Sequence, residues 1–268
     1  MFGKTVDQSK STEMTGPMMN QSQAQGALNA ISLDQLLMLA DGTLSKSALD
    51  SINHFESILS SAKNASEKKQ ALIQLAEKWN STGNIIVAGT YYEQLANLNN
   101  DPTMWNEAAA RFGISYNNVS DSLVRGFSVN HAINAYQQLI KLDSLNQDYK
   151  VGLALAYMDG AGNVMAGVSL LKEVEAVDPD NIQMNLTLGR FGIISGQFDK
   201  AIIRLQKVIS LSKDNDVLAE AWYQLGEAYR ATGKKEDAIK SIEKSRDLIT
   251  NEDFKKQLDI YIQQLKNS

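Results

Sequence analysis

The sequence predicts an all-α protein, a right-handed α-solenoid built from stacked antiparallel helix pairs. Only three prolines occur in 268 residues, below the usual share of about 5%, and proline is the residue that interrupts helices. From about residue 31 to residue 265, apolar residues recur every three or four positions, which is the period of an amphipathic helix. No stretch alternates with the period of two that marks a strand. An internal repeat, described below, completes the prediction.

The chain begins with a tail and two helices that precede the repeats. Residues 1–29 are rich in Ser, Thr, Gln, Met and Gly and lack helical periodicity, so we expect a disordered tail. A short helix fits residues 32–40, and a longer one fits residues 44–62. Together these two helices predict an N-terminal helical cap over residues 30–68.

A recurring pattern divides most of the remaining chain into units. Each unit has a small residue, a large apolar residue four positions later, and an apolar or small residue three further on. The five triplets are Ala88, Tyr92, Leu95; Ala132, Tyr136, Leu139; Gly167, Leu171, Val174; Ala201, Leu205, Val208; and Ala238, Ile242, Ser245. Such a period predicts helix pairs that stack on one another. We expect about five pairs over residues 69–250, closed by a capping helix over residues 251–268.

A glycine marks the turn in four of these units. It stands five residues before the small residue, where a tight turn between helices requires the positive φ that glycine accepts. The four glycines are Gly83, Gly162, Gly196 and Gly233. The small residues are expected where the two antiparallel helices of a pair approach most closely.

The last unit resembles a repeat of a known family. The residues that carry the resemblance are Trp222, Leu225, Gly226, Tyr229, Gly233, Ala238 and Ile242. Their types and spacing are similar to the 34-residue pattern of the tetratricopeptide repeat. Residues 178–181, Asp-Pro-Asp-Asn, are similar to the junction that links one such repeat to the next. Residues 157–162 in the third unit also resemble the related Sel1-like repeats.

Three local expectations follow from the repeat register. The second unit carries extra residues around positions 115–129, which we interpret as longer helices. In the last unit Trp222 is expected to face the core with Leu225 and Tyr229. The pattern Thr250-x-x-Asp253 is typical of a capping box and predicts the start of the final helix.

Composition excludes several classes of partner. The chain has 31 acidic and 26 basic residues, a net charge of −5, which argues against nucleic acid because such surfaces need a basic excess. No apolar run approaches the roughly 18–20 residues of a membrane helix, so direct membrane insertion is not expected. Cysteine is absent. We therefore expect a soluble chain, with the cytoplasm favoured; the alternative is a periplasmic or membrane-anchored protein whose leader or anchor has been removed.

No pattern of residues indicates catalysis, a metal site or a cofactor. The two histidines, His54 and His131, fall in separate amphipathic helices and are interpreted as structural or surface residues. No cluster of His, Asp and Glu has the spacing of metal ligands. We therefore expect a non-enzymatic protein without a metal ion or cofactor.

The resemblance implies a concave groove lined by the first helix of each unit. Tyrosine and arginine are enriched among the anchors of protein interfaces. The residues predicted to line this groove are Tyr149, Leu186, Arg190, Ile193, Tyr223, Glu227 and Arg230. The lysines with which some family members grip a peptide carboxylate are missing here, so that clamp is not expected. We expect a protein or peptide partner; the alternative is a structural scaffold or a self-associating assembly subunit.

Overall fold

The computed structural model describes residues 30–267. In that range it contains 13 α-helices, one short π-helix and no strand, which confirms the all-α class. The tail predicted for residues 1–29 lies outside the described residues, and the division into cap, repeats and final cap stays a prediction. The helices are α1 (Leu33–Asp41), α2 (Lys46–Ser61), α3 (Ala65–Ser81), α4 (Ile85–Asn99), α5 (Pro102–Asn118), α6 (Ser122–Leu142), α7 (Gln147–Leu155), the π-helix η2 (Ala156–Gly160), α8 (Val164–Val177), α9 (Ile182–Ile194), α10 (Phe198–Leu211), α11 (Asn215–Ala231), α12 (Lys235–Leu248) and α13 (Glu252–Asn267).

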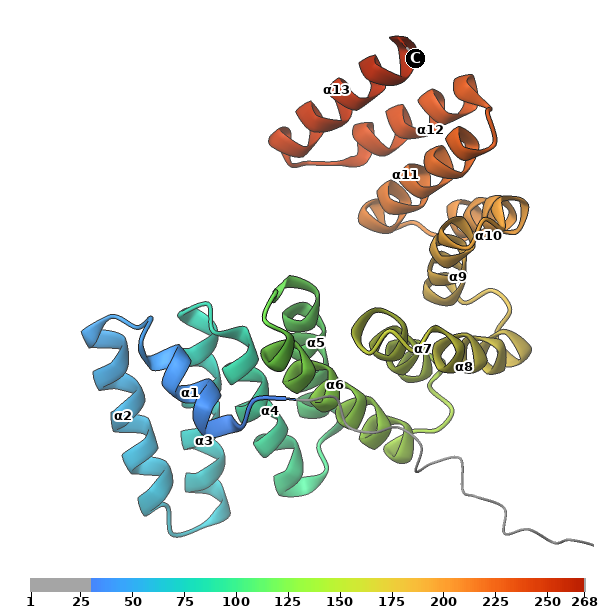
Figure 1. The fold of residues 1–268 in the computed structure, drawn as a ribbon. Coiled ribbons are helices and arrows are strands. Elements are labelled where there is room, and N and C mark those ends of the chain that lie inside the picture. Colours follow the sequence, from blue (N-terminus) through green and yellow to red (C-terminus); the bar gives the residue numbers. More distant parts are fainter. Residues whose placement is uncertain (1–29, 268) are drawn as a thin grey trace, which may run out of the picture.

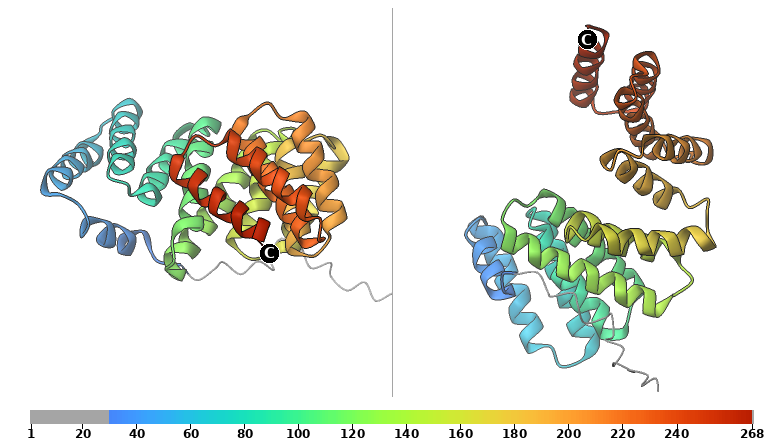
Figure 2. Two further views of the ribbon diagram at one scale, coloured as in Figure 1. Left: turned by 90° about the horizontal axis from the view of Figure 1, so that it is seen from above. Right: turned by 45° about the vertical axis from the view of Figure 1, so that its right-hand side comes forward.

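The helices stack as antiparallel pairs along a curved path (Figure 1). Helices α1 and α2 lie at one end of this path and α13 lies at the other (Figure 2). Helices α9, α11 and α13 lie toward the inside of the curve, opposite α5 and α7, whereas α10 lies on its outside. We call the surface formed by α5, α7, η2, α9, α11 and α13 the inner face. The stacked pairs confirm the predicted solenoid.

Glycines form the turns within the helix pairs, as the sequence predicts. All four have positive φ: Gly83 at 80°, Gly162 at 68°, Gly196 at 74° and Gly233 at 75°. A residue with a Cβ is disfavoured at such φ values, so these positions fix where one helix ends and its partner begins.

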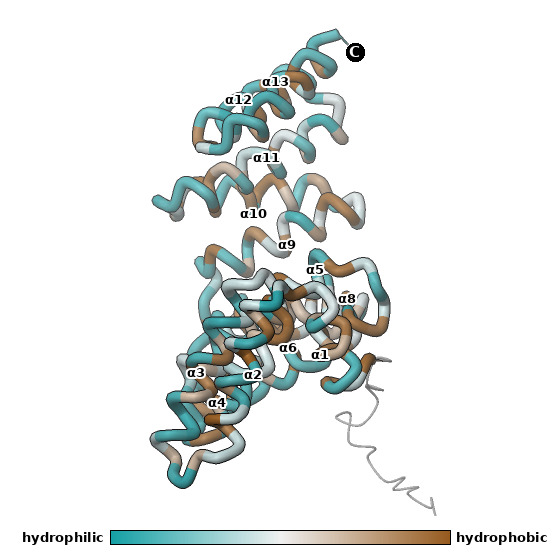
Figure 3. The backbone as a smooth tube through the Cα atoms, turned by 90° about the vertical axis from the view of Figure 1, so that its left-hand side faces the viewer, coloured by the Kyte–Doolittle hydropathy of each residue, from teal (hydrophilic) through white to brown (hydrophobic). Residues whose placement is uncertain are grey.

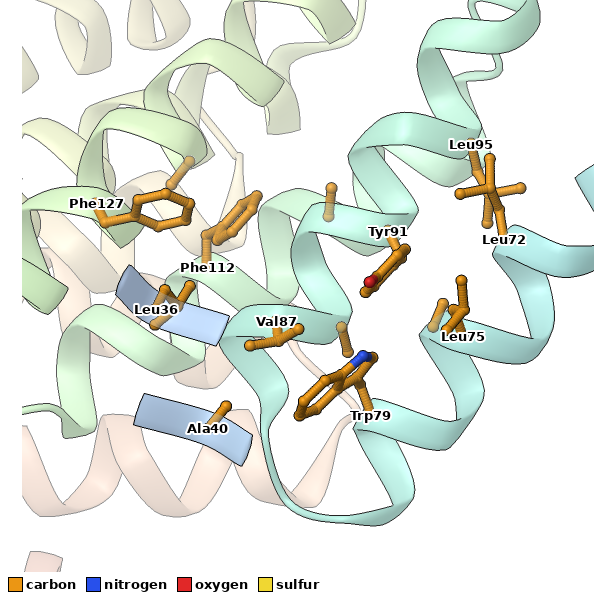
Figure 4. Packing of buried hydrophobic residues seen from close by; sticks show 14 of the residues in the cluster. Leu36, Ala40, Leu72, Leu75, Trp79, Val87, Tyr91, Leu95, Phe112 and Phe127 are labelled. Carbon is orange, nitrogen blue, oxygen red and sulfur yellow. The ribbon is translucent and has the colours of Figure 1, made fainter. Parts of the chain in front are cut away.

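The N-terminal half has a continuous apolar core. Trp79 of α3 is 1% exposed and lies beside Val87 and Tyr91 of α4 (Figure 4). The same core extends to Phe112 of α5 and is covered by Leu36 of α1. Each helix therefore buries its apolar stripe only by contacting its neighbours, as expected for a stacked repeat.

Small residues stand where paired helices come closest. A Cβ built on Gly226 of α11 would lie 2.5 Å from Cγ1 of Ile242 and 3.2 Å from the backbone oxygen of Ala238, both on α12. A Cβ on Gly189 of α9 would lie 2.9 Å from Leu205 of α10. These separations are shorter than van der Waals contact, so the pairs cannot close around larger residues.

The longer helices predicted for the second unit are present. Helix α5 has 17 residues and α6 has 21, so the extra residues extend the helices instead of forming a long loop. In the third unit, α7 ends in the π-helix η2, and Gly167 of α8 packs against Met158. A π-helical turn of this kind accommodates one extra residue within a helix.

The expected capping box at Thr250 is wrong by one residue. Asn251 caps α13, because its Oδ1 accepts from the backbone N–H groups of Asp253 and Phe254 at 3.0 Å. An asparagine side chain satisfies the free N–H groups of a first turn as well as a threonine does, so the helix begins at Glu252.

The expectation for Trp222 is confirmed in part, because Trp222 and Tyr229 pack against the core that contains Leu225. Leu225 is buried, at 2% exposure, but Trp222 and Tyr229 are only half-buried. Trp105, which occupies the corresponding position of the second unit, is 1% exposed. The side chain at this position of the repeat is therefore buried in the second unit and partly exposed to solvent in the last unit.

None of the helices between residues 30 and 267 is long and apolar enough to span a bilayer.

Two glycines on inner-face helices provide a test of the close approach. We expect Gly226→Ala to lower the free energy of unfolding by about 1–3 kcal/mol, because the added methyl overpacks the contact with α12. Gly113→Ala is the matched control, because no atom lies within 4 Å of a Cβ at Gly113 in α5. That change should raise stability by about 0.5–1 kcal/mol through helix propensity. Urea unfolding measures both, and equal changes would contradict the packing described.

The two related tryptophans should differ in their contribution to stability. Trp105→Ala should cost about 3–5 kcal/mol, because it leaves a cavity in a closed core. Trp222→Ala should cost clearly less, since part of its indole is already in contact with water. Urea unfolding of the two variants compares them, and a larger loss at Trp222 would refute this difference.

Candidate functional site

Helix α11 presents three of the predicted groove residues together. Tyr223, Glu227 and Arg230 follow one another at helical spacing, on a helix whose start is fixed by the Asp214 cap. Tyr223 is 37% exposed. Arg230 donates to Glu227 through Nη2 at 2.8 Å and through Nε at 3.2 Å. The hydroxyl of Tyr261, on α13, donates to the other oxygen of Glu227.

The contacts of Glu227 change the ionisation of its neighbours. The hydrogen bond to Glu227 raises the pKa of Arg230, so its guanidinium stays charged. Burial, and then the bond to Glu227, raise the pKa of Tyr261, so its hydroxyl keeps the proton that it donates. Arg230 is therefore already paired with a carboxylate and is not a free cation for an acidic ligand.

Helix α9 is joined to the preceding unit through Asp159. Nη2 of Arg190 lies 2.6 Å from Oδ2 of Asp159, which belongs to η2. Arg125 of α6 donates to the backbone oxygen of the same residue. The guanidinium of Arg190 also lies 4.7 Å from the ring centre of Phe191. Arg190 is therefore held in place across the boundary between two units.

Glu220 and Gln224 stand one helical turn apart on α11, and the charge of Arg190 is felt at Glu220. Nε2 of Gln224 donates to Oε1 of Glu220 at 2.7 Å, and Gln224 itself is 7% exposed. Glu220 is exposed to solvent, but the protein around its carboxylate partly desolvates it. This desolvation raises the pKa of Glu220, and the nearby charge of Arg190 opposes the rise.

Two predicted residues of α9 do not offer free surface. Leu186 is 4% exposed and belongs to the core formed with Leu205 and Leu225, so the prediction that it lines the groove needs correction. Ile193 is partly buried against the same core. Gly192 stands at the position where the last unit has Tyr229. Leu186 instead fills part of the contact between α9, α10 and α11.

Tyr149 lies apart from the other predicted residues. It packs with Tyr136 against the core around Trp105 and lines an open pocket of about 490 Å³ between α5 and α7. Asn106 lines the same pocket. The structure thus brings Tyr223, Glu227 and Arg230 together and leaves Tyr149 in a separate pocket.

Sequence reasoning did not select two residues that complete this surface. Tyr261 lies on α13, and its hydroxyl reaches Glu227 of α11 across 34 positions of sequence. Glu220 stands one helical turn before Tyr223, and that spacing on α11 could have indicated it. The pairing of Tyr261 with Glu227 joins two different helices, so no pattern of neighbouring residues in the sequence indicates it.

The histidine that makes polar contacts, His131, is half-buried at the edge of the N-terminal half's core. His131 lies close to Glu93 through Nδ1 and stacks on Phe127, with ring centres 4.1 Å apart. Within residues 30–267, no three His, Asp or Glu side chains are grouped so that they could hold a metal ion.

The fold and the inner face define a class of protein, the helical repeat solenoid. A family model described as "Tetratricopeptide repeat" matches residues 219–251. Together with the solved structures below, this match confirms the resemblance to the tetratricopeptide repeat family. Repeats of this kind support a protein-interaction role and are generally non-enzymatic.

Solved structures share the fold at low sequence identity. TTC0263, a thermophilic tetratricopeptide repeat protein of Thermus thermophilus, aligns with a TM-score of 0.54 and 19% identity, covering 75% of this chain and all of that one. A chain of the Cut9–Hcn1 hetero-tetramer of APC/C aligns with a TM-score of 0.56 and 19% identity, covering 88% of this chain and 49% of that one. At these identities the likeness concerns the fold alone.

One curated relative is similar over part of the chain. Lipopolysaccharide assembly protein B of Escherichia coli (strain K12) is 29% identical over 108 residues, which cover 38% of this chain. The aligned part is 27% of that protein, so this chain corresponds to about a quarter of the relative's length.

The raised pKa of Glu220 predicts a pH-dependent effect on stability. The folded state holds the Glu220 proton more tightly than the unfolded state does, so stability falls as pH rises from the ordinary glutamate range through the raised pKa. Glu220→Gln keeps an acceptor for Gln224 but cannot ionise. The stability of the variant relative to the parent should therefore increase between about pH 4 and pH 7.

Urea unfolding at several pH values measures this difference. Glu77→Gln on α3 is the control, because that exposed carboxylate forms no ion pair with the described residues. A difference for Glu220→Gln that does not change with pH would contradict the effect of desolvation.

Proposed function

We propose that the chain is a non-enzymatic module that holds a partner protein or peptide on its inner face, across α9, α11 and α13. The observation that carries this proposal is the arrangement around Tyr223, whose ring is exposed while the charged residues beside it are paired. Tyrosine supplies a large contact area with few torsions to immobilise. The exposed ring is thus suited to anchor a partner.

The surroundings of Tyr223 support binding without rearrangement. Arg190 is fixed by Asp159, and Glu227 is fixed by Arg230 and by Tyr261. Because these bonds exist before any partner arrives, little side-chain order is lost on binding. The geometry therefore favours docking on a preformed surface.

The paired charges also restrict the chemistry of the partner. Both predicted cations, Arg190 and Arg230, already have a carboxylate partner. A partner that needed either cation would have to break an existing ion pair. We therefore favour recognition through apolar contact with Tyr223 and hydrogen bonds to its polar neighbours, rather than capture of an acidic ligand.

Self-association is the second candidate function. Large apolar side chains are exposed on α8 and α10, with Met165 at 78%, Val177 at 68% and Ile203 at 66%. Exposed apolar area of this kind is used in protein contacts. Light scattering over a concentration series tests it, and a monomer at all concentrations would argue against an assembly subunit.

Removal of the anchor tests the first proposal. Tyr223→Ala combined with Arg230→Ala should reduce partner capture about tenfold or more, because a buried aromatic anchor carries a large share of binding energy. Affinity capture from cells that encode this chain, quantified by mass spectrometry, measures the loss. Circular dichroism should show unchanged helix content.

The matched control removes the same kinds of side chain from helices far from the proposed surfaces. Ile58→Ala with Lys69→Ala also deletes one large exposed apolar group and one cation, on α2 and α3. This variant should retain every partner that the parent chain captures. Partners retained equally by both variants would rule out the inner face as the binding surface.

A further inference from the structure

A second concave surface lies between α10, α11 and α12, away from Tyr223 and Glu227. Its volume is about 260 Å³, and Trp222 and Leu225 of α11 form its apolar side with Ile209 of α10. Gln206, Tyr229, Asp237, Lys240, Ser241 and Lys244 complete the lining. Nε2 of Gln206 donates to the Tyr229 hydroxyl at 3.1 Å, so the aromatic wall is held in place. We call this surface the outer pocket.

The second unit shows how the same position is normally closed. There Trp105, the counterpart of Trp222, is covered by Ala135 and Leu139 of α6 and is 1% exposed. The repeat register aligns these two residues with Ser241 and Ser245 of α12. Replacement of the leucine by a serine removes the side chain that would cover the indole.

The two serines of α12 are turned toward backbone oxygens. The hydroxyl of Ser241 donates to the oxygen of Asp237, and the hydroxyl of Ser245 donates to the oxygen of Ala219. Helix α12 is also largely hydrophilic along its length (Figure 3). Neither serine therefore extends over Trp222, and the pocket stays open.

The unit before the last closes the corresponding position in another way. Asn185 stands at the position of Trp222, and Arg204 stands at the position of Ser241. Arg204 donates to Asn185 at 3.1 Å and to Glu175 at 2.8 Å. In that unit, a partly exposed ion pair therefore occupies the position that is left open beside Trp222.

The rim of the outer pocket is cationic in a chain that is acidic overall. Nζ of Lys244 lies 4.1 Å from the ring centre of Trp222, and Nζ of Lys234 lies 5.7 Å from that of Tyr229. Among residues 30–267, Lys240 and Lys244 form no ion pair with an acid. Asp237 is the one acidic residue in the lining. The rim thus has a surplus of positive charge next to a half-buried indole.

We propose that the outer pocket docks an acidic segment of a partner protein that carries large apolar side chains. One of these side chains would pack on Trp222 and Ile209, and carboxylates beside it would pair with Lys240 and Lys244. Tryptophan is the residue most typical of strongly contributing positions in interfaces, and the lysines complement the charge of the segment. This surface is separate from the inner face, so the proposal does not depend on the function proposed there.

The three tryptophans of the chain allow a direct test by NMR. Each gives one indole N–H signal, and Trp222→Phe identifies that of Trp222. The probe is the peptide acetyl-Glu-Asp-Leu-Phe-Asp-Glu-amide. The Trp222 signal should shift progressively as this peptide is added, while the signals of the buried Trp79 and Trp105 should not. The charge-reversed peptide acetyl-Lys-Arg-Leu-Phe-Arg-Lys-amide should leave all three signals in place.

Charge reversal on the rim tests the role of the lysines. Lys240→Glu with Lys244→Glu should raise the Kd of the acidic peptide about tenfold or more. Lys68→Glu with Lys69→Glu is the matched control, because it changes the net charge equally on the exposed side of α3. That control should leave the Kd unchanged, and both variants should keep the helix content of the parent.

Three results would overturn the proposal. The first is a Trp222 signal that does not respond to the acidic peptide. The second is an equal response to both peptides, or equal effects of the two double variants. Either result would show that the pocket does not recognise the charge of the peptide. The third is a Trp222 signal that shifts with protein concentration alone, which would identify a second copy of this chain as the occupant.

Discussion

The close approach of the two helices in each pair is the constraint on which the rest of this structure depends. At Gly226 the backbone of α11 comes so near α12 that a single methyl group would meet Ile242. Because the two helices of a pair are that close, the next pair can stack on them, and the apolar stripes of neighbouring helices join into shared core clusters. The curvature of the chain, and with it the inner face, follows from this stacking.

The inner face is held together by polar bonds that cross from one unit to the next. Asp159 joins η2 to α9 through Arg190, and Glu227 joins α11 to α13 through Tyr261. These bonds fix the neighbouring helices relative to one another and use up the charges that would otherwise attract ions. Beside these paired charges, Tyr223 is 37% exposed. A surface of this kind favours contact with a protein over capture of a small charged ligand.

Residues at equivalent positions of the repeat differ in burial because the residues around them differ. Leu139 covers the side chain of Trp105, which is buried. The partner helix of Trp222 has Ser245 at that position, and Trp222 stays partly exposed to solvent. The two tryptophans have the same place in the repeat pattern, so their own identity cannot explain the difference. The partner helix decides whether such a residue is part of the core or part of a surface.

The sequence by itself determined the all-α class, the helix pairs and the glycine turns, because these depend on periodicity and on backbone φ at single positions. It also predicted that Tyr223, Glu227 and Arg230 share one side of a helix, since that follows from helical geometry alone. Only the tertiary structure decided that Leu186 is buried, that Arg190 pairs with Asp159 and that Tyr261 reaches Glu227. The physical reason is that burial and ion pairing depend on helices that are neighbours in space but distant in sequence.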